Sequence, residues 1–181
     1  ARDRLAFDEL LCLQLGLQKL KSARRRMTSV SIRDTGTIEK FVKSLDFELT
    51  AGQKQAIAEA VSDMARNVPM NRLIQGDVGC GKTAVAAALI SHCVKGGFQA
   101  AFMAPTELLA EQHYASLSPL FENMGIKAAV LTGSTKAKER ERIASLCASG
   151  QLDVLIGTHT LIEEGVRFEN LGLAVTDEQH R

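Results

Sequence analysis

The sequence lacks the features that mark a membrane-spanning, secreted or low-complexity protein. It has no uninterrupted apolar run of 18 residues, no secretory signal, no internal repeat and no compositionally biased block. Its four cysteines include no C-x-x-C pair, the spacing of many zinc and redox sites. Hydrophobic residues make up 45% and charged residues 24% of the chain, close to the averages of globular proteins. We therefore predict a globular protein of the cytoplasm with reduced thiols and no membrane partner.

The chain also lacks a strong net charge. Lys and Arg total 22 against 21 Asp and Glu, which gives a formal net charge of +1. The distribution is uneven, because residues 1–26 hold seven basic and three acidic side chains, a balance of +4 that leaves −3 for the remainder. Any electrostatic attraction to a polyanion such as DNA must therefore be local.

A helical pattern opens the chain. Apolar residues recur there at gaps of four, three, four and three, the spacing of one helix face: Ala6, Leu10, Leu13, Leu17 and Leu20. Basic residues follow the last apolar turn, where cations suit the helix dipole. We interpret residues 1–45 as a linker helix and connector, in preference to a direct nucleic-acid element. The 181 residues leave room for one domain, which we place at 46–181.

From residue 50 onward the pattern alternates between short apolar runs and longer amphipathic ones. A helix is predicted over residues 50–67, closed by Pro69. The predicted strands are 73–75, 100–103, 128–131, 154–156 and 171–175, and the further predicted helices are 84–94, 107–121 and 136–147. This alternation is typical of an α/β fold, a parallel sheet with helices on both faces. Such folds bind phosphate ligands at the carboxyl ends of their strands.

One segment fits the phosphate-loop pattern G-x-x-x-x-G-K-[ST], and it lies between a predicted strand and a predicted helix. It consists of Gly76, Asp77, Val78, Gly79, Cys80, Gly81, Lys82 and Thr83. Its glycines let consecutive N–H groups point at one phosphate of ATP. Lys82 would reach the β- and γ-phosphates, and Thr83 would offer its hydroxyl to Mg²⁺. A chance match in a chain of this length has a probability on the order of one per cent.

Two adjacent carboxylates, Asp177 and Glu178, directly follow the predicted strand 171–175. Asp177 can hold Mg²⁺, usually through water, and Glu178 can orient and deprotonate the water that attacks the γ-phosphate. Alone, the pair could equally be a solvated loop; beside a phosphate loop it favours ATP hydrolysis. His180 has two open interpretations, a structural histidine or a γ-phosphate sensor. The other histidines share no metal-ligand spacing, and we assign no zinc.

The run from Asp177 to His180 is a DExH-type box, and together with the phosphate loop it resembles the superfamily 2 helicases. The segment LTAGQ resembles their upstream glutamine motif, in which Gln53 would read the adenine edge. Three more segments agree in order, and the resemblance implies that they contact DNA. The residues concerned are Pro105 and Thr106 in APTELLAEQH, Thr132, Gly133 and Ser134 in LTGS, and Thr158 and His159 in GTHTLI.

The wording of these motifs, and the leader RLAFDELLCLQLGL, is most similar to the RecG family of helicases. The DEQHR ending favours RecG over the related transcription-repair coupling factor. The resemblance covers nearly the whole chain, and its departures, Cys80 and Gly52, remove no reactive group. It implies a RecA-like ATP-binding lobe, incomplete at its carboxyl end, of a bacterial-type motor that remodels stalled forks and Holliday junctions. A second motor lobe and a wedge domain would be missing from this chain.

Hydroxyl groups are the DNA contacts that we expect at these motifs, from Thr106, Thr132, Ser134 and Thr158. Short hydroxyls and backbone N–H groups bind phosphates without reading base sequence. Ordinary turn chemistry at the ends of strands explains each of these residues, taken singly, about as well.

Two other functional classes remain open from the sequence. One is a different P-loop protein, such as a nucleoside kinase, a nucleotide-gated switch or a coupling-factor translocase. The other is a module that binds Mg-ATP weakly and hydrolyses almost none, because an arginine finger from a second lobe is typically worth about 10³ to 10⁵ in rate.

Overall fold

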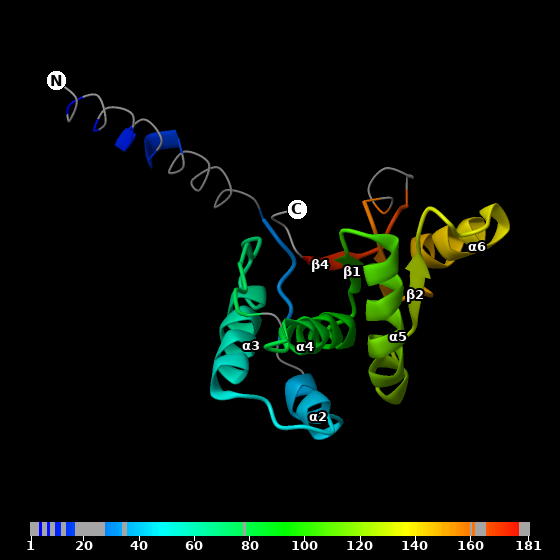
Figure 1. Ribbon diagram of the computed structural model, residues 1–181, viewed down its shortest axis with the longest axis horizontal. Helices are drawn as coiled ribbons and strands as arrows, with labels where there is room; N and C mark the ends of the chain where they lie inside the picture. Colours follow the sequence, from blue (N-terminus) through cyan, green and yellow to red (C-terminus); the bar gives the residue numbers. More distant parts are fainter. Residues whose placement is uncertain are drawn as a thin grey trace.

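The structure is a computed structural model that describes residues 4, 7, 10–11, 14–16, 28–33, 36–77, 79–159, 161 and 166–177. Its helices and strands follow one another in the order α2 (Thr37–Lys43), α3 (Ala51–Met64), α4 (Lys82–Lys95), β1 (Gln99–Met103), α5 (Glu107–Asn123), β2 (Ala128–Leu131), α6 (Ala137–Ala148), β3 (Val154–Gly157) and β4 (Leu171–Thr176). Figure 1 shows these elements coloured along the chain.

The four strands form one parallel sheet in the order β2-β3-β1-β4. Successive side chains of a strand point to opposite faces. On β1, Ala100 and Phe102 lie in the larger core, whereas Met103 packs in the smaller one. On β3, Ile156 and Leu155 divide in the same way. Both faces are therefore covered, as is usual for parallel strands.

Helix α4 is the centre of the larger core. Residues 85–93 of α4 are all buried, and the helix contacts α2, α3, β1 and β4 (Figure 1). Its side chains are nearly all apolar or small, which lets a helix be surrounded on every side. Helix α6 covers the opposite face, where Ile143 and Cys147 pack against Leu131 and Leu155. The predicted sheet with helices on both faces is confirmed.

The predicted strand 73–75 is wrong, because residues 71–77 form no strand. A strand exists only where a neighbouring strand satisfies its backbone groups, and here the segment is tied to α3 instead. The Arg72 guanidinium binds Asp63 Oδ2 at 2.6 Å and Glu59 Oε2 at 2.5 Å. Hydrogen bonds from Gln55 and from Arg72 lower the pKa of Glu59. The bonds to Asp63 and Glu59 raise the pKa of Arg72. Leu73 stays 76% exposed.

Helix α2 was not predicted, and it belongs to the core of the lobe. Its Phe41 is completely buried, as is Ile32 in the segment before it, and both pack with the residues of α3 and α4. The core of the lobe therefore begins upstream of residue 46.

Most of the predicted opening helix lies outside the described residues, including Ala6, Leu13, Leu17 and Leu20. The residues that are described there are helical, and Leu10 and Leu15 are 65% and 55% exposed. No helix in the described part of the chain is long and apolar enough to cross a membrane.

Candidate nucleotide and nucleic-acid site

The carboxyl ends of all four strands stop at one level. Leu131 of β2 is in register with Gly157 of β3, Gly157 with Met103 of β1, and Met103 with Thr176 of β4. Backbone bonds continue past these positions, from Ala104 N–H to Gly157 O and from Asp177 N–H to Met103 O, both at 2.8 Å. The residues that follow the four strands therefore form one row: Thr132, Thr158, Ala104 and Asp177. Since strands lie about 4.8 Å apart, the row spans roughly 14 Å.

The phosphate loop lies at the amino end of α4, as predicted. Gly81 caps this helix with φ +80°, and Gly79 has φ +78°, a region that L-residues with side chains rarely adopt. The described loop residues 76–77 and 79–80 are exposed, and Thr83 in the first helical turn is half-buried. Val78 lies outside the described residues. A helix amino end with these glycines can receive a phosphate.

Lys82 is bound to its own loop. Its Nζ donates to the carbonyl oxygens of Gly76 and Asp77, both at 2.8 Å. A phosphate is a stronger acceptor for an ammonium group than a neutral carbonyl is. Nucleotide binding would therefore exchange these two loop contacts for phosphate oxygens.

Gln53 lies against the phosphate loop rather than in open solvent. Its Oε1 accepts from Thr50 N–H at 2.8 Å within a capping box of α3, and its Nε2 donates to Cys80 O at 2.8 Å. A Cβ at Gly81 would collide with that Nε2, so a side chain there would displace the Gln53 amide. Its predicted role in reading adenine stays a prediction, because both ends of this amide are engaged within the protein.

Asp177 begins the DExH-type box at the end of β4, beside the core of the sheet. Its Oδ2 is 2.8 Å from His113 Nε2 on α5, and its side chain is 26% exposed. The rest of the box, including Glu178 and His180, lies outside the described residues.

The donor set suits Mg²⁺, because Thr83 and Asp177 supply hard oxygen atoms. In the described ranges no three His, Cys, Asp or Glu side chains gather as they would around a metal held by protein alone. Magnesium usually keeps several waters and takes further ligands from phosphates, so two protein oxygens fit this ion.

The predicted DNA-contacting residues divide into an exposed and a buried group. Thr106, Ser134 and His159 are exposed, and Pro105 is half-buried. Thr106 caps α5, where its Oγ1 accepts from Leu109 N–H at 3.3 Å. By contrast, Thr132 and Thr158 are 3% and 2% exposed. Direct contact of these two hydroxyls with a DNA phosphate would require their turns to open.

The turn after β2 is held by a network of its own. Thr132 Oγ1 lies 2.8 Å from Ser134 Oγ, and Arg140 Nη2 on α6 donates to the carbonyl oxygens of Thr132, Gly133 and Thr135 at 3.1 to 3.4 Å. A Cβ at Gly133 would lie 2.6 Å from Glu107 Oε1. Glycine there lets the first turn of α5 approach the turn after β2.

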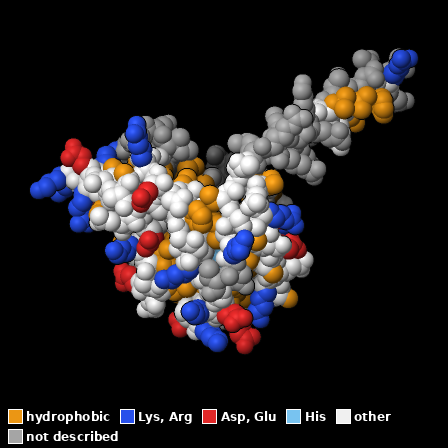
Figure 2. All heavy atoms as spheres, turned by 180° about the vertical axis from the view of Figure 1, so that it is seen from behind, with side chains coloured by type: hydrophobic (Ala, Val, Ile, Leu, Met, Phe, Trp, Pro, Cys, Tyr) orange, Lys and Arg blue, Asp and Glu red, His pale blue; other side chains and the backbone are white. Residues whose placement is uncertain are grey.

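The surface carries no continuous basic field on the face shown in Figure 2. Lys, Arg, Asp and Glu side chains are interspersed there. This agrees with the net charge of +1, and a nucleic-acid contact at this lobe would depend on placed groups rather than on bulk attraction.

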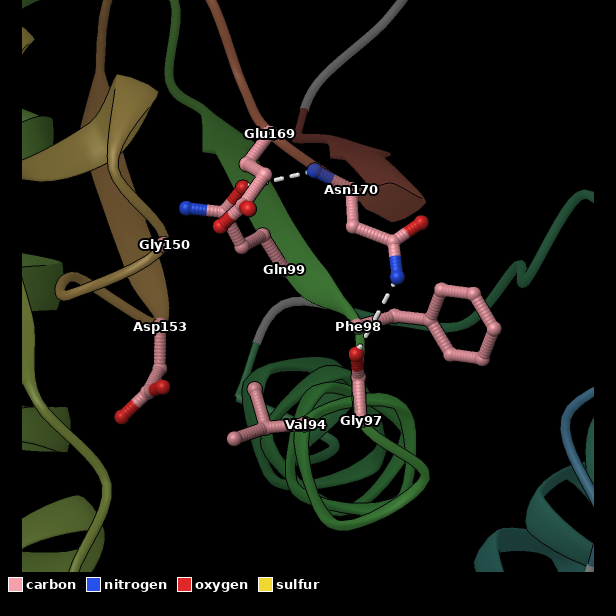
Figure 3. Close-up of a pocket in the computed structure, with 8 residues that line it drawn as sticks. All are labelled: Val94, Gly97, Phe98, Gln99, Gly150, Asp153, Glu169 and Asn170. Atoms are coloured by element: carbon pink, nitrogen blue, oxygen red, sulfur yellow. Dashed lines mark hydrogen bonds between the residues drawn. The ribbon is translucent and has the colours of Figure 1, made fainter.

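A hollow lies at the opposite edge of the sheet. A cavity of about 560 Å³ is lined by residues at the amino ends of β1, β3 and β4, with Asp153 and Glu169 among them (Figure 3). Ligands of open parallel sheets bind beyond the carboxyl ends of the strands. This cavity is therefore distinct from the candidate nucleotide site.

Comparison with known proteins defines the class. The sequence profile of the DEAD/DEAH box helicase family matches residues 50–181, and the chain belongs to that family. Within it, the chain is similar to ATP-dependent DNA helicase RecG, with 49% identity to the protein of Thermotoga maritima over the whole chain and 23% of the relative. It is 46% identical to RecG of Bacillus subtilis over the whole chain and 27% of that protein. The chain thus spans about a quarter of these relatives.

Solved structures agree. "Structure of RecG bound to three-way DNA junction" matches with a TM-score of 0.93 and 49% identity, over the whole chain and 25% of that chain. A hypothetical ATP-dependent RNA helicase from Sulfolobus tokodaii matches with a TM-score of 0.60 at 20% identity, over 81% of this chain and 42% of that one, a likeness of fold alone. The predicted RecA-like helicase lobe is confirmed.

Two residues in this region were not singled out from the sequence. His113 was noted only as lacking metal-ligand spacing, and Arg140 was seen only as part of a predicted helix. His113 contacts Asp177, 64 positions away, so no local spacing could have indicated it. Arg140 lies five to eight residues from the carbonyl oxygens that it binds, but the pattern there indicated only a helix.

Proposed function

We propose that this chain is the first motor lobe, preceded by a linker helix, of a RecG-type ATP-dependent DNA helicase that acts on branched DNA. The single observation that carries the proposal is the row of strand ends, which places Asp177 level with Thr132 and Thr158 across one sheet edge. The RecG structure with the same fold at a TM-score of 0.93 is bound to a three-way junction, which supports branched DNA as the partner. We place the protein in the cytoplasm.

The phosphate loop would bind ATP through its N–H groups and through Lys82. The Lys82 ammonium group would give up its bonds to the carbonyl oxygens of Gly76 and Asp77 and bind the phosphates instead. Thr83 and Asp177 would hold Mg²⁺, which when bound neutralises charge on the β- and γ-phosphates. Glu178 orients the attacking water and takes its proton. Gln53 would keep the loop against α3 before ATP binds, and would exchange one of its two contacts for the adenine edge when ATP is bound.

DNA would lie along the carboxyl edge, against the exposed Thr106, Ser134 and His159. These hydroxyls and the backbone N–H of Gly133 would hold phosphates without reading sequence, which suits an enzyme that recognises the shape of a junction. Pro105 has no backbone N–H and would contribute only contacts of its ring. The buried Thr132 and Thr158 would keep the turns in position.

The remaining three quarters of a RecG-length protein would supply a second motor lobe and a wedge domain. An arginine finger from the second lobe is worth about 10³ to 10⁵ in rate. We therefore expect the 181-residue chain to bind Mg-ATP weakly and to hydrolyse it barely.

The test is the ATPase of the full-length protein with a three-way junction, with linear duplex of the same composition, and without DNA. We expect the junction to stimulate hydrolysis most, and Lys82→Ala to remove the stimulation. Equal stimulation by linear duplex would favour a coupling-factor translocase. Hydrolysis or nucleotide binding that no DNA changes would favour a nucleotide-gated switch and contradict the proposal.

A further inference from the structure

His113 contacts the residue proposed to hold magnesium, although no role has been assigned to it. It lies on α5, and its Nε2 is 2.8 Å from Asp177 Oδ2 at the end of β4. The two residues are 64 positions apart in the sequence. The side chain of His113 is 13% exposed and that of Asp177 is 26% exposed, so the pair is sheltered from solvent yet reaches the carboxyl edge of the sheet.

Strand β1 holds both His113 and Asp177 in place. The imidazole of His113 lies against Phe102 of β1, with ring centroids 4.8 Å apart and an interplanar angle of 45°. The backbone N–H of Asp177 donates to Met103 O, also on β1, at 2.8 Å. Strand β1 therefore sets both the imidazole and the main chain of Asp177, and the contact between the two side chains sets the direction of the carboxylate.

The chemistry of the pair assigns the donor. An ionised carboxylate only accepts hydrogen bonds, so Nε2–H donates to Oδ2. This hydrogen bond restricts the rotation of the carboxylate and so sets how Asp177 presents its oxygens at the carboxyl edge of the sheet. Partners that orient a ligating group in this way typically change metal affinity about 10- to 100-fold when they are removed.

We infer that His113 is a positioning residue that orients the Asp177 carboxylate for Mg²⁺. The inference rests on the proposed function, because it takes Asp177 as the metal-holding residue. The competing interpretation is that the imidazole only fills space beside Phe102. The two interpretations require different chemical groups. A positioning role requires an N–H donor at the place of Nε2, whereas a packing role requires only a ring.

Two substitutions separate these demands. His113→Gln keeps an amide N–H donor the same number of bonds from the backbone as Nε2, but has no ring. His113→Phe keeps a ring against Phe102 but has no donor. The measurement is the affinity for Mn²⁺, a paramagnetic substitute for Mg²⁺, by electron paramagnetic resonance on the full-length protein with ADP bound. The midpoint of thermal unfolding of each variant reports packing.

We expect His113→Phe to bind Mn²⁺ about 10-fold more weakly than the wild type, and His113→Gln to bind it nearly as tightly as the wild type. The reverse order would overturn the inference. If the Phe variant unfolds at a lower temperature, the comparison moves to His113→Gln against His113→Ala, which both lack the ring. Tighter Mn²⁺ binding by the Gln variant supports the inference, and equal affinity overturns it.

The variant Asp177→Ala distinguishes a wrong role for His113 from a wrong metal site. If Asp177→Ala weakens Mn²⁺ binding while His113→Phe does not, only the role of His113 is refuted. If Asp177→Ala leaves Mn²⁺ affinity unchanged, the proposed metal site itself is refuted, and with it the premise of the inference.

Discussion

The two edges of the sheet use hydrogen bonds in different ways. At the amino edge, the buried side chain of Gln99 joins three segments: its Nε2 donates to Cys147 O and Leu152 O at 2.9 and 2.7 Å, and its Oε1 accepts from Asn170 N–H at 3.0 Å. At the carboxyl edge, the phosphate loop and the turn after β2 each contain hydrogen bonds within themselves. Lys82 binds the phosphate loop that carries it, and Thr132 binds Ser134 two residues away.

This difference separates stability from binding. Polar groups that are buried and joined across elements are costly to lose, because their partners stay buried without a hydrogen bond. Loops bonded to themselves can exchange those bonds for a ligand without loosening the sheet. We therefore expect substitutions at the amino edge to lower stability, and substitutions at the carboxyl edge to lower activity.

Lys82→Ala should have the largest effect. We expect the ATPase rate of the full-length protein to fall by at least about 10²-fold, as when one preorganised group that stabilises transition-state charge is removed. The free energy of unfolding should change by less than about 0.5 kcal/mol, since the Nζ contacts only its own loop. Steady-state kinetics and denaturant unfolding of the same sample check both halves. A large loss of stability would remove the contrast between the edges.

Gln99→Leu should show the opposite behaviour. The substitution removes the Gln99 bonds to Leu152 O and Asn170 N–H and leaves Cys147 O with only its bond from Gly150 N–H. We therefore expect the free energy of unfolding to fall by about 3 kcal/mol. The dissociation constant for ATP should stay the same. Denaturant unfolding and nucleotide titration of the 181-residue chain measure the two quantities. If the folded Gln99→Leu variant bound ATP more weakly than the wild type, the amino edge of the sheet would also affect nucleotide binding at the carboxyl edge.

Arg140→Ala should affect DNA more than ATP. Without its bonds to three carbonyl oxygens the turn after β2 loosens, and we expect the affinity of the full-length protein for a three-way junction to fall about fivefold, the equivalent of one hydrogen bond. Arg142→Ala is the matched control, because Arg142 lies on the same helix, is 68% exposed and binds Glu139 at 3.3 Å. Equal losses in the two variants, measured by fluorescence anisotropy, would argue against a role for the turn.

Thiol labelling should show the smallest effect. Burial raises the pKa of Cys93 to about 12 and that of Cys147 to about 11. A raised thiol pKa makes the reactive thiolate rarer at a given pH, so at pH 8 these two should react far more slowly than the exposed Cys80. ATP should slow the alkylation of Cys80 several-fold by covering the loop. Peptide mapping by mass spectrometry identifies the site, and unprotected Cys80 at saturating ATP would contradict the predicted nucleotide position.

Much of the fold could be predicted from local pattern. Helices α3, α4, α5 and α6 and all four strands lie where periodicity predicted them, because amphipathic spacing and short apolar runs are properties of the chain itself. The strand predicted at 73–75 failed because pairing depends on a neighbour, and Arg72 instead ties the segment to α3. Helix α2 escaped prediction since its seven residues carry little periodic signal.

The candidate site divides in the same way. The phosphate loop and Asp177 could be read from sequence, because contiguous residues make up each motif. The burial of Thr132 and Thr158, at 3% and 2% exposure, could not, since the exposure of a side chain depends on how its turn packs in the folded protein. The roles of Glu178 and His180 stay predictions.

The sequence by itself determined which residues can act as phosphate loop, DExH-type box and strand-end turns, because each is a short run whose chemistry and backbone freedom are local. Only the tertiary structure decided how these runs meet. The parallel register places Thr132, Thr158 and Asp177 in one row, and the packing of α5 on the sheet brings His113 to Asp177. Such contacts depend on which surfaces bury one another, and no spacing along the chain encodes that choice on its own.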